Sequence, residues 1–171
     1  AVDHMVKFSC GYPHILQEIG FATFEYAQGG IPDFHHVETA VFGGADADYP
    51  PAMETIGRVY YEPLWMEFTE EQKKVVRTIT ASPYKQLSIP EIQKECKDKF
   101  EITEDIARKS VEELVRAEHL KQSRGDKRIE LADSAFLIWL EYKYVPREYI
   151  DEGDGQVVGI VVSKINALLV A

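Results

Sequence analysis

Cysteine is scarce in this chain of 171 residues, and its positions match no disulfide or metal-binding motif. The two cysteines, Cys10 and Cys96, lie far apart, and neither belongs to a CxxC pair or a Cys/His cluster. This usage excludes a disulfide framework and a structural zinc site, and it suits a reducing compartment. We therefore expect a cytoplasmic protein.

The motifs of catalysis are also lacking. No G-x-x-x-x-G-K-[ST] sequence is present to cradle phosphates, and no Asp-Glu pair follows an apolar strand to hold magnesium. No Ser/His/Asp set has a spacing that singles it out, and the adjacent His35 and His36 do not share a helix face. We predict that this chain alone is not an enzyme and holds no metal and no cofactor of its own.

An excess of basic residues is missing too, since the net charge is −10. This speaks against a general nucleic-acid coat. The charge is uneven, however: residues 1–69 carry a net −8, residues 70–143 a net 0 and residues 144–171 a net −2. The lysines and arginines are therefore concentrated in the middle of the chain, where a nucleic-acid contact would need them.

What the sequence does contain is a series of helix start and stop signals. In the first half these predict helices over residues 13–28, 33–42 and 51–68, with a kink or split near Tyr61 because Pro63 lies inside the third. A Thr69 cap opens a fourth helix to about Thr80. The first half of the chain is thus expected to be a helical bundle.

The stretch from Ser88 to Leu131 has the most specific order of elements. A capping box at Ser88 opens one helix to about Phe100, and Thr103 opens a second to about His119. Two strand-like runs, 120–123 and 128–131, then flank a four-residue turn. Helix, turn, helix and hairpin in this order predict a winged helix-turn-helix with a small β-hairpin wing.

The end of the chain changes in character. Residues 151–155 form an acidic, glycine-rich linker, and residues 157–171 are almost wholly apolar. Fifteen residues are too few for a confident transmembrane helix, so we expect no membrane span. The alternatives are a segment that docks on this domain, one that docks on a second copy and makes a homo-oligomer, and a membrane or aggregation-prone segment.

Two stretches carry a resemblance to a known family. One is Ser9-Cys10-Gly11-Tyr12-Pro13-His14-Ile15-Leu16-Gln17-Glu18-Ile19-Gly20. It resembles the Gly-x-Pro stretch that opens the lid helices of archaeal and bacterial AAA-type ATPases, the origin-recognition-like, signal-transducing group. The second, residues 61–72, is similar to the linker between lid and winged-helix domain in that group. The resemblance covers residues 6–144.

The resemblance implies a mainly α fold with a lid-like subdomain over residues 6–68 and a winged helix-turn-helix over 69–144. His4-Met5 is typical of a cloning remnant, which we expect over residues 1–5, and composition assigns 145–171 to the linker and tail. The resemblance further implies that the chain is the C-terminal portion of a larger protein whose upstream ATPase domain binds ATP. It also implies that Gly11, Tyr12 and Pro13 lie beside the bound nucleotide. An Arg that related lids place early in this helix has no counterpart between Pro13 and Gln28.

The residues that would contact duplex DNA lie on the second helix of the winged unit and on its hairpin. Early residues of that helix enter the major groove, and wing cations contact phosphates. The predicted set is Arg108, Lys109, Lys121, Arg124, Lys127 and Arg128. The leading interpretation is a DNA-binding output domain controlled by nucleotide state. The alternatives are a winged helix for protein–protein contact or dimerisation, and a free-standing regulator with its own sensing half.

Overall fold

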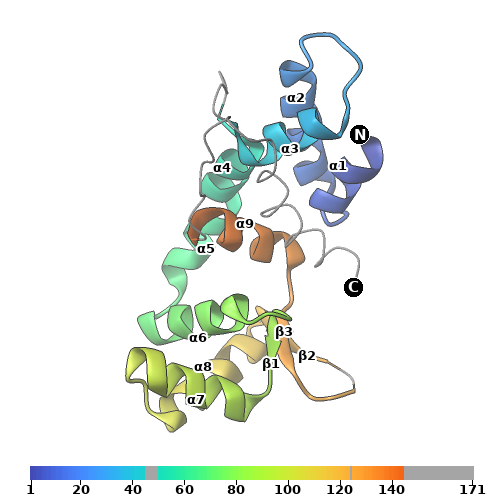
Figure 1. Ribbon diagram of the computed structural model, residues 1–171. Coiled ribbons are helices and arrows are strands. Elements are labelled where there is room, and N and C mark those ends of the chain that lie inside the picture. The colour runs from blue at the N-terminus through green and yellow to red at the C-terminus, as the bar shows by residue number, and fades with distance from the viewer. Residues whose placement is uncertain (45–49, 124, 145–171) are drawn as a thin grey trace, which may run out of the picture. The chain divides into compact units, whose positions relative to one another are not determined.

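Helices dominate the fold, which confirms the mainly α prediction, and a small three-stranded antiparallel sheet accompanies them (Figure 1). The computed structural model describes residues 1–44, 50–123 and 125–144. The chain divides into two units: unit 1 combines Ala1–Val59 with the chain from Ile138 onward, and unit 2 is Tyr60–Leu137. No helix in the described part is long and apolar enough to cross a bilayer.

Unit 1 is built from short helices packed around aliphatic side chains. The main packing partners are α2 (Pro13–Tyr26) and α3 (Phe34–Phe42). Both begin as expected, α2 with Pro13 in its first turn and α3 with an Asp33 cap that accepts a hydrogen bond from the His36 N–H. The helix α1 (Val2–Phe8) was not predicted, and it buries Phe8 in this unit.

The third expected helix is divided, as predicted, near Tyr61. It consists of α4 (Ala52–Ile56), a π-helical turn η1 (Gly57–Tyr61) and α5 (Glu62–Glu67). The cause is Pro63, which lacks an N–H and whose ring clashes with the carbonyl four residues earlier. The wider π turn absorbs this disruption without ending the helical path.

Unit 2 places three helices beside the sheet. The helices are α6 (Glu70–Ala81), α7 (Ile89–Phe100) and α8 (Glu104–Arg116). The strands β1 (Gln86–Leu87), β2 (Leu120–Gln122) and β3 (Ile129–Leu131) pair in the order β1-β3-β2. The expected capping boxes at Thr69 and Ser88 are both present. Strand β1 was not predicted, because two residues are too few to show alternation.

An aromatic cluster fills part of unit 2. Phe136 lies in the first turns of α9 (Ser134–Tyr144), and its ring centroid is 5.3 Å from that of Tyr61 and 6.2 Å from those of Trp65 and Phe68. Asp133 caps α9 by accepting from the N–H groups of residues 135 and 136. Tyr60, the aromatic residue that precedes Tyr61, is by contrast 45% exposed.

Unit 1 also buries a carboxyl group, which the sequence did not single out. Glu38 lies on α3 beside Val37 and is only 9% exposed. One of its oxygens, Oε1, has no hydrogen-bond partner within the described structure. Burial raises the pKa of Glu38 to about 7, because a desolvated carboxylate is penalised relative to the neutral acid.

This burial predicts that Glu38→Gln stabilises the protein only at higher pH. The folded chain holds the Glu38 proton until about pH 7, whereas the unfolded chain loses it near the ordinary value of 4.5. Stability of the natural chain therefore falls as pH rises from 4.5 through 7. We expect Glu38→Gln to raise the free energy of unfolding by about 3 kcal/mol above pH 7 and by nothing near pH 4.5. Urea unfolding across this pH range measures the difference, and a pH-independent difference would refute the assignment.

Candidate nucleic-acid interface

The outer face of α8 presents the two helix cations that the sequence predicts. Residues 107, 110, 111 and 114 face inward and are buried, so Arg108 and Lys109 lie on the exposed side. Thr103 fixes the start of the helix, since its side chain accepts a hydrogen bond from the N–H of Ile106. Arg116 shares this exposed face at i+8 from Arg108.

The hairpin that follows α8 carries the other predicted cations. Strand β2 packs against α8 and pairs with β3, with Lys121 opposite Glu130. The Ser123 N–H donates to the Arg128 carbonyl at 2.8 Å, and this bond closes the hairpin loop. Lys127 is exposed at the loop. Arg124, also predicted as a contact, lies outside the described residues.

Most of these cations are already paired with carboxylates of unit 2. The sequence alone does not show this pairing. The pairs are Arg108–Asp105 at 2.9 Å, Lys109–Glu113 at 3.9 Å, Lys121–Glu130 at 3.4 Å, and Arg128 with Asp126 at 3.1 Å and Glu91 at 3.9 Å. The nearest carboxylates follow from helical spacing and cross-strand pairing. Glu91 comes from α7, which the sequence does not place beside the hairpin.

Two of these carboxylates are held in the charged form. Hydrogen bonds from the Ser88 N–H and hydroxyl lower the pKa of Glu91, and Arg128 adds to the effect. A hydrogen bond from Ser123 lowers the pKa of Asp126, again with a contribution from Arg128. The hairpin surface therefore keeps its negative charges at neutral pH, and DNA has to compete with them for Arg128.

That competition is not prohibitive. All of the pairs are solvent-exposed to a substantial degree, and an exposed ion pair contributes about 0.2–1 kcal/mol. A phosphate that replaces the carboxylate gives the cation a comparable partner and releases a counterion. Arg116 and Lys127 form no ion pair in the part of the chain that the structure describes. Arg116 was not in the predicted set, although its i+8 spacing from Arg108 is a signal for it.

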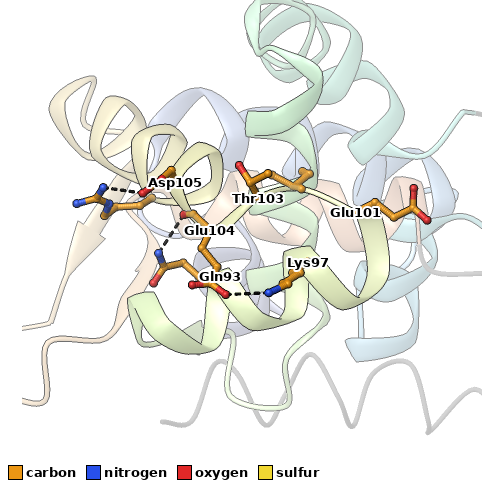
Figure 2. A pocket seen from close by; sticks show the side chains of 8 residues that line it. Gln93, Lys97, Glu101, Thr103, Glu104 and Asp105 are labelled. Carbon is orange, nitrogen blue, oxygen red and sulfur yellow. Dashed lines mark hydrogen bonds and ion pairs between the residues drawn. The ribbon is translucent and has the colours of Figure 1, made fainter.

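A hollow of about 640 Å³ lies where α7 meets the start of α8 (Figure 2). Both of its cations are paired, since Lys97 Nζ lies 3.2 Å from Glu104 Oε1 and Arg108 is bound to Asp105, and Glu101 adds a third carboxylate to the lining. Glu104 and Asp105 occupy the first turn of α8, where the helix dipole favours negative charge. The amino end of α8 is thus taken by its own carboxylates and is a poor phosphate site.

In unit 1, the residues predicted to lie beside a nucleotide form an exposed turn between α1 and α2. Gly11 has a φ of 79°, a left-handed conformation that favours glycine. Its N–H donates to the Ser9 hydroxyl at 3.3 Å. Tyr12 and Pro13 follow at the surface, with Tyr12 as the N-cap residue of α2. The predicted trio therefore sits together and is open to solvent.

The other candidate metal ligands and nucleophiles of the described residues do not form a metal or catalytic site. Within the described ranges, no group of three or more His, Cys, Asp or Glu side chains is close enough to hold a metal ion. His36 is bound to Asp33, with Nδ1 lying 2.6 Å from Oδ1. Cys96 is fully buried, and this burial raises the pKa of its thiol. A thiol in that environment is a packing residue rather than a nucleophile.

Comparison with known protein families, curated proteins and solved structures finds no match to this chain. No relative therefore assigns a role to any residue. The case for a function depends on the arrangement of unit 2, on the exposed turn of unit 1 and on the sequence resemblance.

Proposed function

We propose that unit 2 is a winged helix-turn-helix that binds duplex DNA through α8 and the β2–β3 hairpin. The observation that carries this proposal is the order α6, β1, α7, α8, β2, β3, with a hairpin packed against a helix that exposes cations. In such a module the helix enters the major groove and the hairpin lies along the phosphate backbone. The helix pair is then α7–α8, and the wing is β2–β3.

The charges favour a binding mode based on phosphates and led by the hairpin. Glu104 and Asp105 bring negative charge to the start of α8, which weakens base contacts there. Lys127 lies on the hairpin and forms no ion pair among the described residues. Lys121 pairs with Glu130, and Arg128 pairs with Asp126 and Glu91, so a phosphate has to displace a carboxylate at these two cations. Affinity is therefore expected to be modest and strongly salt-dependent.

The parent protein in this proposal is an AAA-type ATPase, and unit 1 is its lid. The resemblance of residues 9–20 and the solvent-exposed turn at Gly11, Tyr12 and Pro13 support this assignment. An upstream domain would bind ATP against that turn, and its nucleotide state would control the DNA-binding unit. The gene tests this directly: a P-loop encoded upstream of the Val6 codon supports the proposal, and a start codon at Met5 refutes it.

Paired substitutions in the full chain test the DNA surface. Lys127→Ala/Arg128→Ala removes two hairpin cations and should lower affinity for a fluorescent duplex roughly tenfold or more at about 0.1 M salt, because each lost phosphate contact removes one released counterion. Arg108→Ala/Lys109→Ala should have a smaller effect, because Glu104 and Asp105 in the first turn of α8 weaken phosphate contacts there, whereas Lys127 on the hairpin forms no ion pair among the described residues. Fluorescence anisotropy provides the dissociation constants.

The matched control is Lys94→Ala/Lys99→Ala. These two lysines are exposed on α7, outside the hairpin and α8, so the variant changes net charge equally. It should retain affinity within about threefold, the residual effect of long-range charge. Equal losses in the control and hairpin variants would show that net charge alone matters and would remove the case for a defined surface.

The ion pairs favour a second candidate, a winged helix used for protein–protein contact or dimerisation. Arg128 lies beside both Asp126 and Glu91, and the net charge of −1 of this cluster suits a protein partner better than a polyanion. If unit 2 serves protein–protein contact, the full chain should not bind duplex DNA even at low salt. If the contact is dimerisation, sedimentation should show self-association of the chain. Arg128→Glu disrupts the Arg128 cluster and should abolish this self-association.

A further inference from the structure

An aromatic pair on the outer face of α2 is left uncovered by the described residues of unit 1. Phe21 is 68% exposed and Phe24 is 59% exposed, and their i, i+3 spacing makes them neighbours on the helix surface. The opposite side of α2 is the buried one, with Ile15, Ile19 and Thr23 facing the core of the unit. Two adjacent phenylalanines exposed to this degree are unusual for an isolated surface.

The surroundings of the pair define what can cover it. Gln17, four residues before Phe21 on the same helix, extends the stripe without charge and is exposed. Glu18 and Glu25 lie along one edge of the stripe, at helical positions next to Phe21. We call these residues the α2 face. An apolar segment with a single cation matches it.

Residues 157–171 of the same chain have this chemistry. Eleven of these fifteen residues are apolar, and Lys164 is the one cation among them. They are tethered to unit 1, because the part of α9 from Ile138 to Tyr144 belongs to that unit. Residues 145–156 can span about 40 Å when extended, more than the roughly 30 Å expected across a compact unit of this size.

The size of the α2 face favours a tethered occupant over a second copy. At about 200 Å² per phenylalanine, the pair exposes roughly 250 Å². A stable dimer buries about 800 Å² on each partner. A segment on a short tether needs far less contact area, because its effective concentration is in the millimolar range.

We propose that residues 157–171 dock on the α2 face of their own chain, with apolar side chains on Phe21 and Phe24 and with Lys164 beside Glu18 and Glu25. The docked segment removes the aromatic pair from water. It also makes unit 1 the part of the chain that holds the C-terminal segment.

Zero-length carbodiimide crosslinking of the full chain tests this proposal. The reagent joins the Lys164 amine to a neighbouring carboxylate, and peptide mass spectrometry identifies which one. Glu54 is the internal control, since it is an exposed carboxylate of the same unit on α4. We expect Lys164 to couple to Glu18 or Glu25 about tenfold more than to Glu54, as a tethered, docked segment requires.

A double variant and an isotope mixture complete the test. Phe21→Ser/Phe24→Ser changes only exposed side chains, so the fold should persist and the preference for Glu18 and Glu25 should disappear. Mixing ¹⁴N and ¹⁵N chains separates crosslinks within a chain from those between chains. Equal coupling to Glu54 would overturn the proposal, and so would a preference that survives the double variant. Crosslinks found solely between unlike chains would also overturn it and assign the face to a second copy.

Discussion

Gly57→Ala is expected to destabilise unit 1 by about 2–4 kcal/mol, although alanine is the better helix former. A Cβ at position 57 would lie within 3.0 Å of Nε1, Cδ1 and Cε2 of Trp139. Trp139 is 2% exposed and therefore has no room to withdraw. The backbone of the π turn and the indole ring would have to separate, which opens the core. Urea unfolding followed by circular dichroism measures the loss in free energy of unfolding.

Gly20→Ala is the matched control for this prediction. Gly20 lies within α2 of the same unit, and a Cβ there would meet nothing within 4 Å. The substitution should stabilise the chain by about 0.5–1 kcal/mol, the usual gain from replacing glycine inside a helix. If Gly57→Ala were equally stabilising, the close approach of Trp139 to the π turn would be wrong.

Phe136→Ala is expected to cost about 3–5 kcal/mol of the stability of unit 2. Phe136 is 2% exposed and touches the three aromatic rings of Tyr61, Trp65 and Phe68. Its removal leaves a cavity among rigid rings that cannot collapse to fill it. Trp65 lies in the same cluster, so its fluorescence during urea unfolding reports this transition.

Tyr84→Ala provides the comparison, because Tyr84 belongs to unit 2 and is 77% exposed. Its loss should change the free energy of unfolding by no more than about 0.5 kcal/mol. A cost below about 1 kcal/mol for Phe136→Ala would mean that the aromatic cluster is not a core.

Helix boundaries were predictable because local side chains set them. Each of these signals acts within a few residues of its own position, as the capping boxes at Thr69 and Ser88, the Asp33 cap and the disruption by Pro63 show. Strand β1 was not predicted, because it is defined by its hydrogen bonds to β3, which lies far along the chain. Glu38 is buried because it lies next to Val37 and Val41 on the inward face of α3. Sequence analysis normally assigns a charged residue at such a position to the solvent-exposed face.

The candidate interface was only partly predictable for a related reason. Composition and spacing located the cations of α8 and the hairpin on exposed positions. Their carboxylate partners depend on tertiary structure, since Glu91 reaches Arg128 from another helix and Glu130 meets Lys121 across the sheet. A sequence shows how many charges a surface has, whereas the fold determines which of them neutralise one another. This is why the expected DNA affinity is lower than the cation count suggests.

The most direct test of DNA binding by unit 2 is a titration of the full chain with a fluorescent duplex at several salt concentrations. Three or four phosphate contacts from the hairpin and α8 predict a plot of log K against log salt with a slope of about −3 to −4. Measurable binding at about 50 mM salt with that slope is the expected result. No binding at that salt concentration, or binding with a slope near zero, would contradict the proposal and leave protein contact as the function of this surface.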